Sequence, residues 1–114
     1  MSASVFKING TGAAAIATTA TVPSGRSYQV ISVSCKFSTA PTTSEPFTVT
    51  LDANAGAAYD TLLYTVDPSA TAVTSLLWQP ERPLYLEGGD ALDVAYTNTD
   101  TRTYGVQITV ARVD

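Results

Sequence analysis

The residues in this sequence that could carry chemistry are mainly carboxylates, because the chain has no histidine and a single cysteine. Without histidine the chain lacks the commonest general base, and Ser-His-Asp, Cys-His and histidine-containing zinc sites are excluded. Two carboxylate pairs remain, Asp90 with Asp93 and Glu81 with Glu87. Glycoside hydrolysis needs two carboxylates facing each other across a cleft, whereas Asp90 and Asp93 lie three apart on an expected strand and point to opposite faces. We therefore predict a non-enzymatic protein without cofactors; a carboxylate-based hydrolase is the rival interpretation.

A calcium site is the other chemistry that the spacing suggests. Asp52 and Asn54 place oxygen ligands two residues apart before a glycine, and Asp60 follows. An EF-hand loop requires glutamate at its twelfth position, where this chain has Leu63. We expect the loop to form turns and to hold no metal.

The aromatic residues form a third group of candidates. Tyr28, Tyr59 and Tyr85 lie outside the apolar alternation and are expected at the surface, where they could contact a partner or stack on a sugar. Core or interface roles are commoner for such residues than ligand binding. Arg82 lies between Pro80 and Pro83 in a stiff exposed segment, where it is either a solvated charge or an anchor for a partner.

The elements that must position these residues are short strands. Residues 27–38 carry the strongest pattern, with Ile31, Val33, Cys35 and Phe37 alternating with polar residues. Cys35 is therefore expected to be a buried apolar residue without a disulfide partner. The hairpin at residues 83–98 alternates in the same way around Gly88-Gly89-Asp90, a tight turn. Further strands are predicted at residues 4–9, where Gly10 and Gly12 end the strand, and at 47–52, 62–66, 73–78 and 103–112.

Residues 13–22 are ambiguous between helix and strand. Three consecutive alanines favour helix, whereas several threonines oppose it and Pro23 ends it. We favour extended structure and divide the chain into an N-terminal strand or extended arm, residues 1–22, and a single β-sandwich domain, residues 23–114.

Eight or nine short strands without an amphipathic helix predict an all-β, antiparallel sandwich. Unequal loop lengths favour a jelly roll, two sheets joined by Greek-key connections. An immunoglobulin-like sandwich is the alternative, but its cysteine pair is missing and Trp78 lies late in the chain.

Composition excludes several classes of partner. Charged residues make up only 14% of the chain, and its net charge of −4 is scattered without a basic run, which argues against nucleic-acid binding. No apolar stretch is long enough to span a membrane, and the start lacks the pattern of a signal peptide. A surface so poor in charge favours a subunit of a larger assembly.

Two runs carry a resemblance to a known class of proteins. They are FTVTLDANAGAAYDTLLYTVDPS and LLWQPERPLYLEGGDALDVAYTNTDTRTYGVQI. They resemble small β-rich proteins of tailed bacteriophages and prophages, and jelly-roll decoration (cement) proteins that sit as trimers on phage capsids. The resemblance covers roughly residues 28–110 and transfers no active-site residue.

The resemblance implies a virion structural protein that is made in the cytoplasm of the bacterial host. It would bind the major capsid protein on the head surface as a homo-oligomer, with a trimer favoured, and residues 1–22 are the candidates for reaching a neighbour. A receptor- or carbohydrate-binding module of a tail or fibre is the alternative. The residues predicted to form the interface are Val5, Phe6, Ile8, Ile16, Tyr28, Tyr59, Arg82 and Tyr85.

Overall fold

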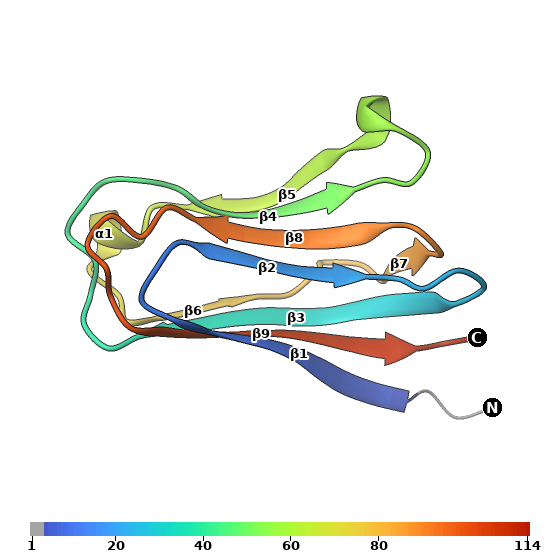
Figure 1. Cartoon of the computed structure of the whole chain (residues 1–114), viewed down its shortest axis with the longest axis horizontal. Helices are drawn as coiled ribbons and strands as arrows, with labels where there is room; N and C mark the ends of the chain where they lie inside the picture. The colour runs from blue at the N-terminus through green and yellow to red at the C-terminus, as the bar shows by residue number, and fades with distance from the viewer. Residues whose placement is uncertain (1–3) are drawn as a thin grey trace.

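A computed structural model, which describes residues 4–114, consists of two antiparallel sheets packed face to face (Figure 1). Sheet A has the order β1-β9-β3-β6, with β7 also paired to β3, and sheet B has the order β2-β8-β4-β5. This confirms the predicted antiparallel β-sandwich. The strands are β1 Ser4–Gly12, β2 Ile16–Thr21, β3 Ser27–Phe37, β4 Phe47–Asp52, β5 Thr61–Val66, β6 Ser75–Trp78, β7 Leu84–Glu87, β8 Ala91–Tyr96 and β9 Tyr104–Arg112.

The strand pairing is that of one long hairpin rolled into two layers. β4 pairs with β5 at the tip of this hairpin, then β3 with β6 and β7, β2 with β8, and β1 with β9. The two ends of the hairpin therefore meet, and Figure 1 shows the start of β1 and the C-terminus at the same end of the molecule. This nested connectivity is that of a jelly roll.

The alternating apolar residues of both sheets meet in one core. Phe37 of β3, Phe47 of β4 and Leu92 of β8 are among its fully buried side chains. The ring of Tyr96 lies between the first two, with centroid distances of 5.5 and 6.3 Å. Cys35 is buried as predicted. The alternation therefore identified the core-facing sides of these strands correctly.

Two details of the predicted strands are wrong. β1 continues through Gly10 to Gly12, and a Cβ at Gly10 would collide with Thr18 Oγ1 on β2. The first glycine therefore permits close packing of the two sheets and does not end the strand. Ile31 does not share the inward face with Val33, because it lies at a β-bulge between Val30 and Ser32.

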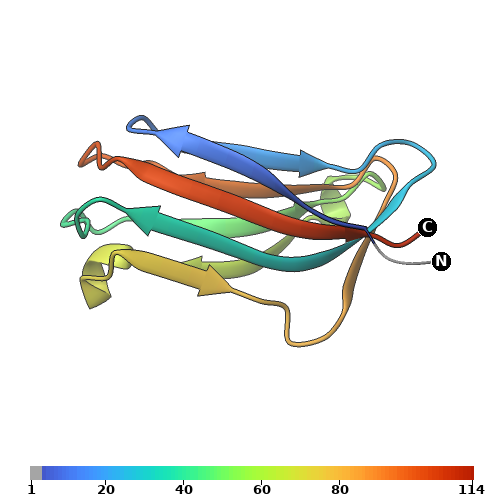
Figure 2. The ribbon, with the colours of Figure 1, turned by 90° about the horizontal axis from the view of Figure 1, so that it is seen from below.

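The described part of the predicted N-terminal segment, residues 4–22, contributes β1 and β2 to the sandwich; residues 1–3 lie outside the described residues. The ambiguous stretch is extended, since residues 16–21 form β2 opposite β8. Two short helical turns connect strands, a 3₁₀ turn at Ala57–Tyr59 and α1 at Pro68–Thr71. In Figure 2 the chain between β6 and β7 leaves the edge of sheet A and returns to it.

Candidate functional site

Asp90 and Asp93, the first predicted carboxylate pair, have separate roles, and Glu81 and Glu87 of the second pair are exposed. Asp90 lies in the β7-β8 turn, where its side chain accepts hydrogen bonds from the main-chain N–H groups of Asn54 and Glu87, both at 2.9 Å. Asp93 lies on the outer face of sheet B and accepts a hydrogen bond from the Thr19 hydroxyl at 2.9 Å. Asp90 therefore ties two turns together, whereas Asp93 belongs to a separate, outward-facing row.

The suggested calcium loop is held by its own hydrogen bonds. Asp60 accepts a hydrogen bond from the main-chain N–H of Ala53 at 2.8 Å, and the Asn54 side chain lies against Gly89. Among residues 4–114, no group of three or more acidic or cysteine side chains is placed to hold a metal ion. The oxygens of Asp60 and Asp90 have structural roles in this loop.

Three other carboxylates stabilise the loops at the α1 end of the sandwich, an arrangement that the sequence did not indicate. Asp100 accepts hydrogen bonds from the main-chain N–H groups of Thr42 and Thr43 at 2.8 and 2.9 Å. Glu45 accepts one from the N–H of Thr99 at 2.8 Å. Asp67 caps α1 and also accepts a hydrogen bond from the Ser44 hydroxyl. These bonds connect loops that are far apart in the sequence and hold them against one another.

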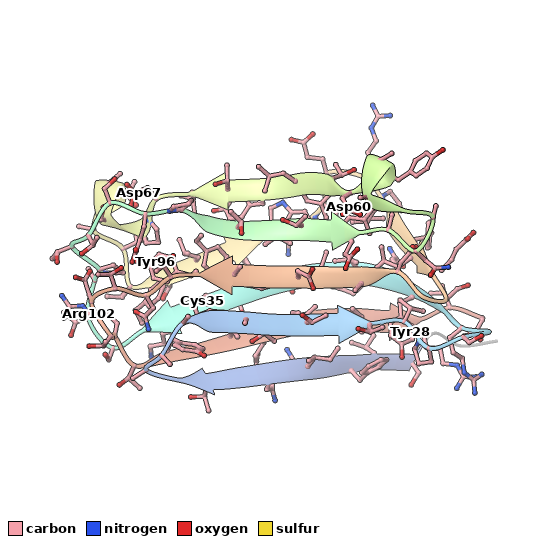
Figure 3. All side chains as sticks on the ribbon, turned by 45° about the horizontal axis from the view of Figure 1, so that its top comes forward. Tyr28, Cys35, Asp60, Asp67, Tyr96 and Arg102 are labelled. Atoms are coloured by element: carbon pink, nitrogen blue, oxygen red, sulfur yellow. The ribbon has the colours of Figure 1, made fainter. Side chains whose placement is uncertain are left out.

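These contacts shift the ionisation of the groups involved. The Thr43 hydroxyl and the main-chain N–H groups of Thr43 and Thr42 lower the pKa of Asp100 to about 2. Burial, followed by the charges of Glu45, Asp100 and Asp67, raises the pKa of Tyr96 to about 12. The Tyr96 hydroxyl has no hydrogen-bond partner among the described residues, and Figure 3 shows Tyr96, Asp67 and Arg102 at the same end of the sandwich. Tyr96 therefore stays protonated at neutral pH.

The residues predicted to form an interface are dispersed. Val5, 63% exposed, and Tyr85, 59% exposed, both lie on the outer face of sheet A. Ile16 is buried in the core and offers no surface to a partner, so this part of the prediction is wrong. Phe6 packs edge-to-face on Tyr28, and both Tyr28 and Ile8 are half-buried. Tyr59 in the 3₁₀ turn and Arg82 between β6 and β7 are exposed.

The exposed tyrosines lie apart from the other aromatic rings. Within the described chain, neither Tyr59 nor Tyr85 makes a ring contact, whereas Trp78 stacks on Tyr64 with a centroid distance of 6.2 Å. Because exposed rings are available to a partner or a sugar, the carbohydrate-binding alternative stays a prediction.

The outer face of sheet A is the best candidate site. Of the exposed large apolar side chains, Val5, Leu77, Tyr85 and Val113 all lie on it. Its outward-facing residues form rows across the strands, because paired residues lie side by side. From the α1 end, these are the Lys36 row (Thr11, Gly105, Lys36, Ser75), the Leu77 row (Asn9, Gln107, Ser34, Leu77), the Lys7 row (Lys7, Thr109, Ser32), the Tyr85 row (Val5, Ala111, Gln29, Tyr85) and the Glu87 row (Val113, Ser27, Glu87).

A hollow opens on this face where β9 begins. It has a volume of about 530 Å³ and is lined by outward-facing residues of the Lys36 and Leu77 rows. Gly105 lies in it, and a Cβ at this position would meet no atom within 4 Å. The sequence signals for Gly105 and Leu77 are the glycine within a strand and the paired leucines of VTSLLW.

Comparison with known proteins adds nothing on function. No family model and no curated protein matches the chain. Among solved structures, the chain is similar to the arabinose-bound α-L-arabinofuranosidase MgGH51, with a TM-score of 0.40 and 18% identity over 90% of this chain and 18% of that chain. So distant a likeness carries no argument. No helix within residues 4–114 is long and apolar enough to cross a membrane.

Proposed function

We propose that this protein is a structural component of a tailed-phage virion, a decoration protein that binds the major capsid protein on the head surface as a homo-oligomer. One observation carries the assembly role. Sheet A exposes Val5, Leu77 and Tyr85 on a regular sheet surface, each more than half accessible. Ordered apolar groups on a flat face are typical of surfaces that become covered. The phage setting comes from the resemblance of residues 28–110.

A role without catalysis is supported by how the carboxylates are used. Asp67, Asp90 and Asp100 accept hydrogen bonds from main-chain N–H groups and fix loops. A carboxylate committed in this way is a poor general base, because those bonds stabilise its ionised form. The loops they fix give the sandwich the rigidity that a clamp between capsid subunits requires.

The number of copies is the point on which the resemblance and the surface differ. The resemblance implies three copies, whereas the positions of Lys36 and Glu87 on sheet A favour a two-fold pair, as argued in the next subsection. Both versions need copies of the chain to associate.

Co-sedimentation tests the capsid role. Purified protein is mixed with heads assembled from a tailed-phage major capsid protein, and the heads are pelleted. We expect the protein to pellet with the heads in a fixed ratio and to raise their melting temperature. Protein that stays in the supernatant with every head preparation would overturn the capsid role. Truncating residues 1–22 is a poor test, because it removes β1 and β2.

A further inference from the structure

We infer that the outer face of sheet A is self-complementary, and that two copies of this chain pack through it about a two-fold axis lying along the Lys7 row. This inference rests on the self-association in the proposed function. It adds the surface, the symmetry and the residues that meet.

The argument starts from the symmetry of the rows. The Leu77 and Tyr85 rows lie on either side of the Lys7 row, and the Lys36 and Glu87 rows lie one step further out. A half-turn about the Lys7 row therefore places the Leu77 row of one copy over the Tyr85 row of the other. It places the Lys36 row over the Glu87 row in the same way. Such a contact is isologous and closes after two copies.

The half-turn brings apolar groups together. Leu77 on β6 and Tyr85 on β7 are 64% and 59% exposed, and both strands follow the same side of β3. Each Leu77 would therefore lie against the partner's Tyr85, twice in the pair. Burial of these exposed side chains supplies the apolar centre that a stable interface needs.

The charges at the two ends of the face match in the same arrangement, whereas the two exposed Lys7 side chains, which lie on the axis, face each other. Lys36 is exposed, and the half-turn places it over Ser27 of the second copy. Glu87 is also exposed and lies beside that Ser27 on the neighbouring strand β7. The ion pairs within residues 4–114 involve only Asp114, so Lys36 and Glu87 are both free to pair between copies. Sheet B differs, because its strands carry Asp52 and Asp93 without a cation. Packing sheet B on itself would bring only like charges together.

The hollow at Gly105 has a matching projection. Val113 follows β9, is 37% exposed, and holds its place through a hydrogen bond from its N–H to the Ser27 carbonyl at 3.0 Å. The half-turn places the Glu87 row, which contains Val113, over the hollow of the second copy. A side chain then fills the space that Gly105 leaves open.

The available area is close to that of a standard interface. Sheet A is four strands wide and its longest strand, β3, has 11 residues, so a strand spacing of about 4.8 Å and a rise of about 3.3 Å per residue give a face of roughly 700 Å². A standard interface buries roughly 800 Å² per partner, so a second copy would use the whole of this face.

Charge exchange tests the contact. The mass of the full chain is measured by sedimentation equilibrium, for which we expect twice the chain mass of 11.9 kDa. Lys36→Glu and Glu87→Lys should each weaken association by about tenfold at low salt, since two ion pairs become repulsive. The double variant should restore it. Asp93→Lys on sheet B is the matched control and should leave the mass unchanged.

Cross-linking supplies a test that does not depend on charge. Leu77→Cys and Tyr85→Cys proteins, each with a single surface thiol, are mixed under mild oxidation. We expect a disulfide-linked dimer in the mixture and little in either protein alone, because Leu77 faces the partner's Tyr85 and not its own copy. Equal cross-linking of each protein alone would overturn the two-fold arrangement.

The outcomes separate the two proposals. If the chain forms a trimer and its mass is the same in the Lys36 and Glu87 variants, the sheet A contact is overturned, whereas the capsid role stands. A pair that behaves as expected but never pellets with heads would overturn the capsid role alone. A monomer that binds heads through sheet A would also overturn the pair, because the capsid protein would then occupy this face.

Discussion

The side-chain amide of Asn98 donates a hydrogen bond to the main-chain carbonyl of Ala14 at 2.8 Å, joining the loop after β8 to the loop before β2. The same amide also donates to the carbonyls of Ala13 and Arg102, and its oxygen accepts from the Arg102 N–H. Asn98 is buried and has a left-handed backbone, with φ of 55°. Asparagine is the non-glycine residue that tolerates this conformation best. One side chain thus satisfies four main-chain groups of two loops.

Replacing Asn98 tests this bracing role. We expect Asn98→Ala to lower the free energy of unfolding by about 3 kcal/mol, because buried carbonyls lose their donors and alanine is strained at positive φ. Asn98→Gly is the matched variant, since it removes the same bonds without the backbone strain. Urea denaturation should therefore rank the proteins wild type, Asn98→Gly, Asn98→Ala. If both variants matched the wild type, the bonds would contribute nothing to stability.

The two glycines Gly10 and Gly105 should respond in opposite ways to the same substitution. A Cβ at Gly10 collides with Thr18 Oγ1 and comes within 3.0 Å of Val106 Cγ1, whereas one at Gly105 meets nothing within 4 Å. We expect Gly10→Ala to cost about 1–3 kcal/mol through overpacking between the sheets. Gly105→Ala, its control, should be neutral or slightly stabilising. Thermal melts of both variants check this; equal losses would contradict the packing argument.

Asp100 should make stability depend on pH in the acid range. Hydrogen bonds from Thr43 and Thr42 lower its pKa to about 2, from 3.8 in the unfolded chain. The unfolded state therefore binds more protons between these values, so the contribution of Asp100 is complete above about pH 4 and is lost as the pH falls towards 2. Asp67, whose pKa is also lowered by the hydroxyls of Ser44 and Ser69, acts in the same direction.

Asp100→Asn isolates this effect, because the amide is similar in shape and does not titrate. Melting temperatures of both proteins are measured from pH 6 to pH 2. We expect the wild type to be the more stable at pH 6 and the difference to shrink towards pH 2. A difference that stays constant with pH would show that the carboxylate charge is not what stabilises these loops.

The sequence was sufficient for the strands but not for the packing between them. Alternation predicted the buried faces of β3, β4, β8 and β9, because a period of two depends only on neighbouring residues. It failed at Gly10, where the reason for the glycine is Thr18 on another strand. It also failed at Ile31, since a bulge shifts the phase of the alternation and leaves no local signal.

The candidate site was predictable only in part. Val5 and Tyr85 were expected at a surface, and they lie in one row of sheet A. Leu77 was not identified, because adjacent leucines in a strand must face opposite ways and the sequence does not say which one is buried. Asp100 was missed for a different reason: its partners Thr42 and Thr43 are 58 and 57 residues away, and only the jelly-roll connectivity brings them together.

The thiol of Cys35 should be unreactive in the folded protein. Burial raises its pKa to about 12, from 9.0, so its thiolate fraction near pH 8 falls about a thousandfold, and the thiolate is the reactive form. We expect iodoacetamide to label denatured protein readily and folded protein hardly at all. A Cys35→Ala, Ser38→Cys protein is the control, since Ser38 is exposed, and it should be labelled in both states. Rapid labelling of the folded wild type would mean that the sheets open at β3, and the cross-linking experiment would then need a Cys35→Ala background.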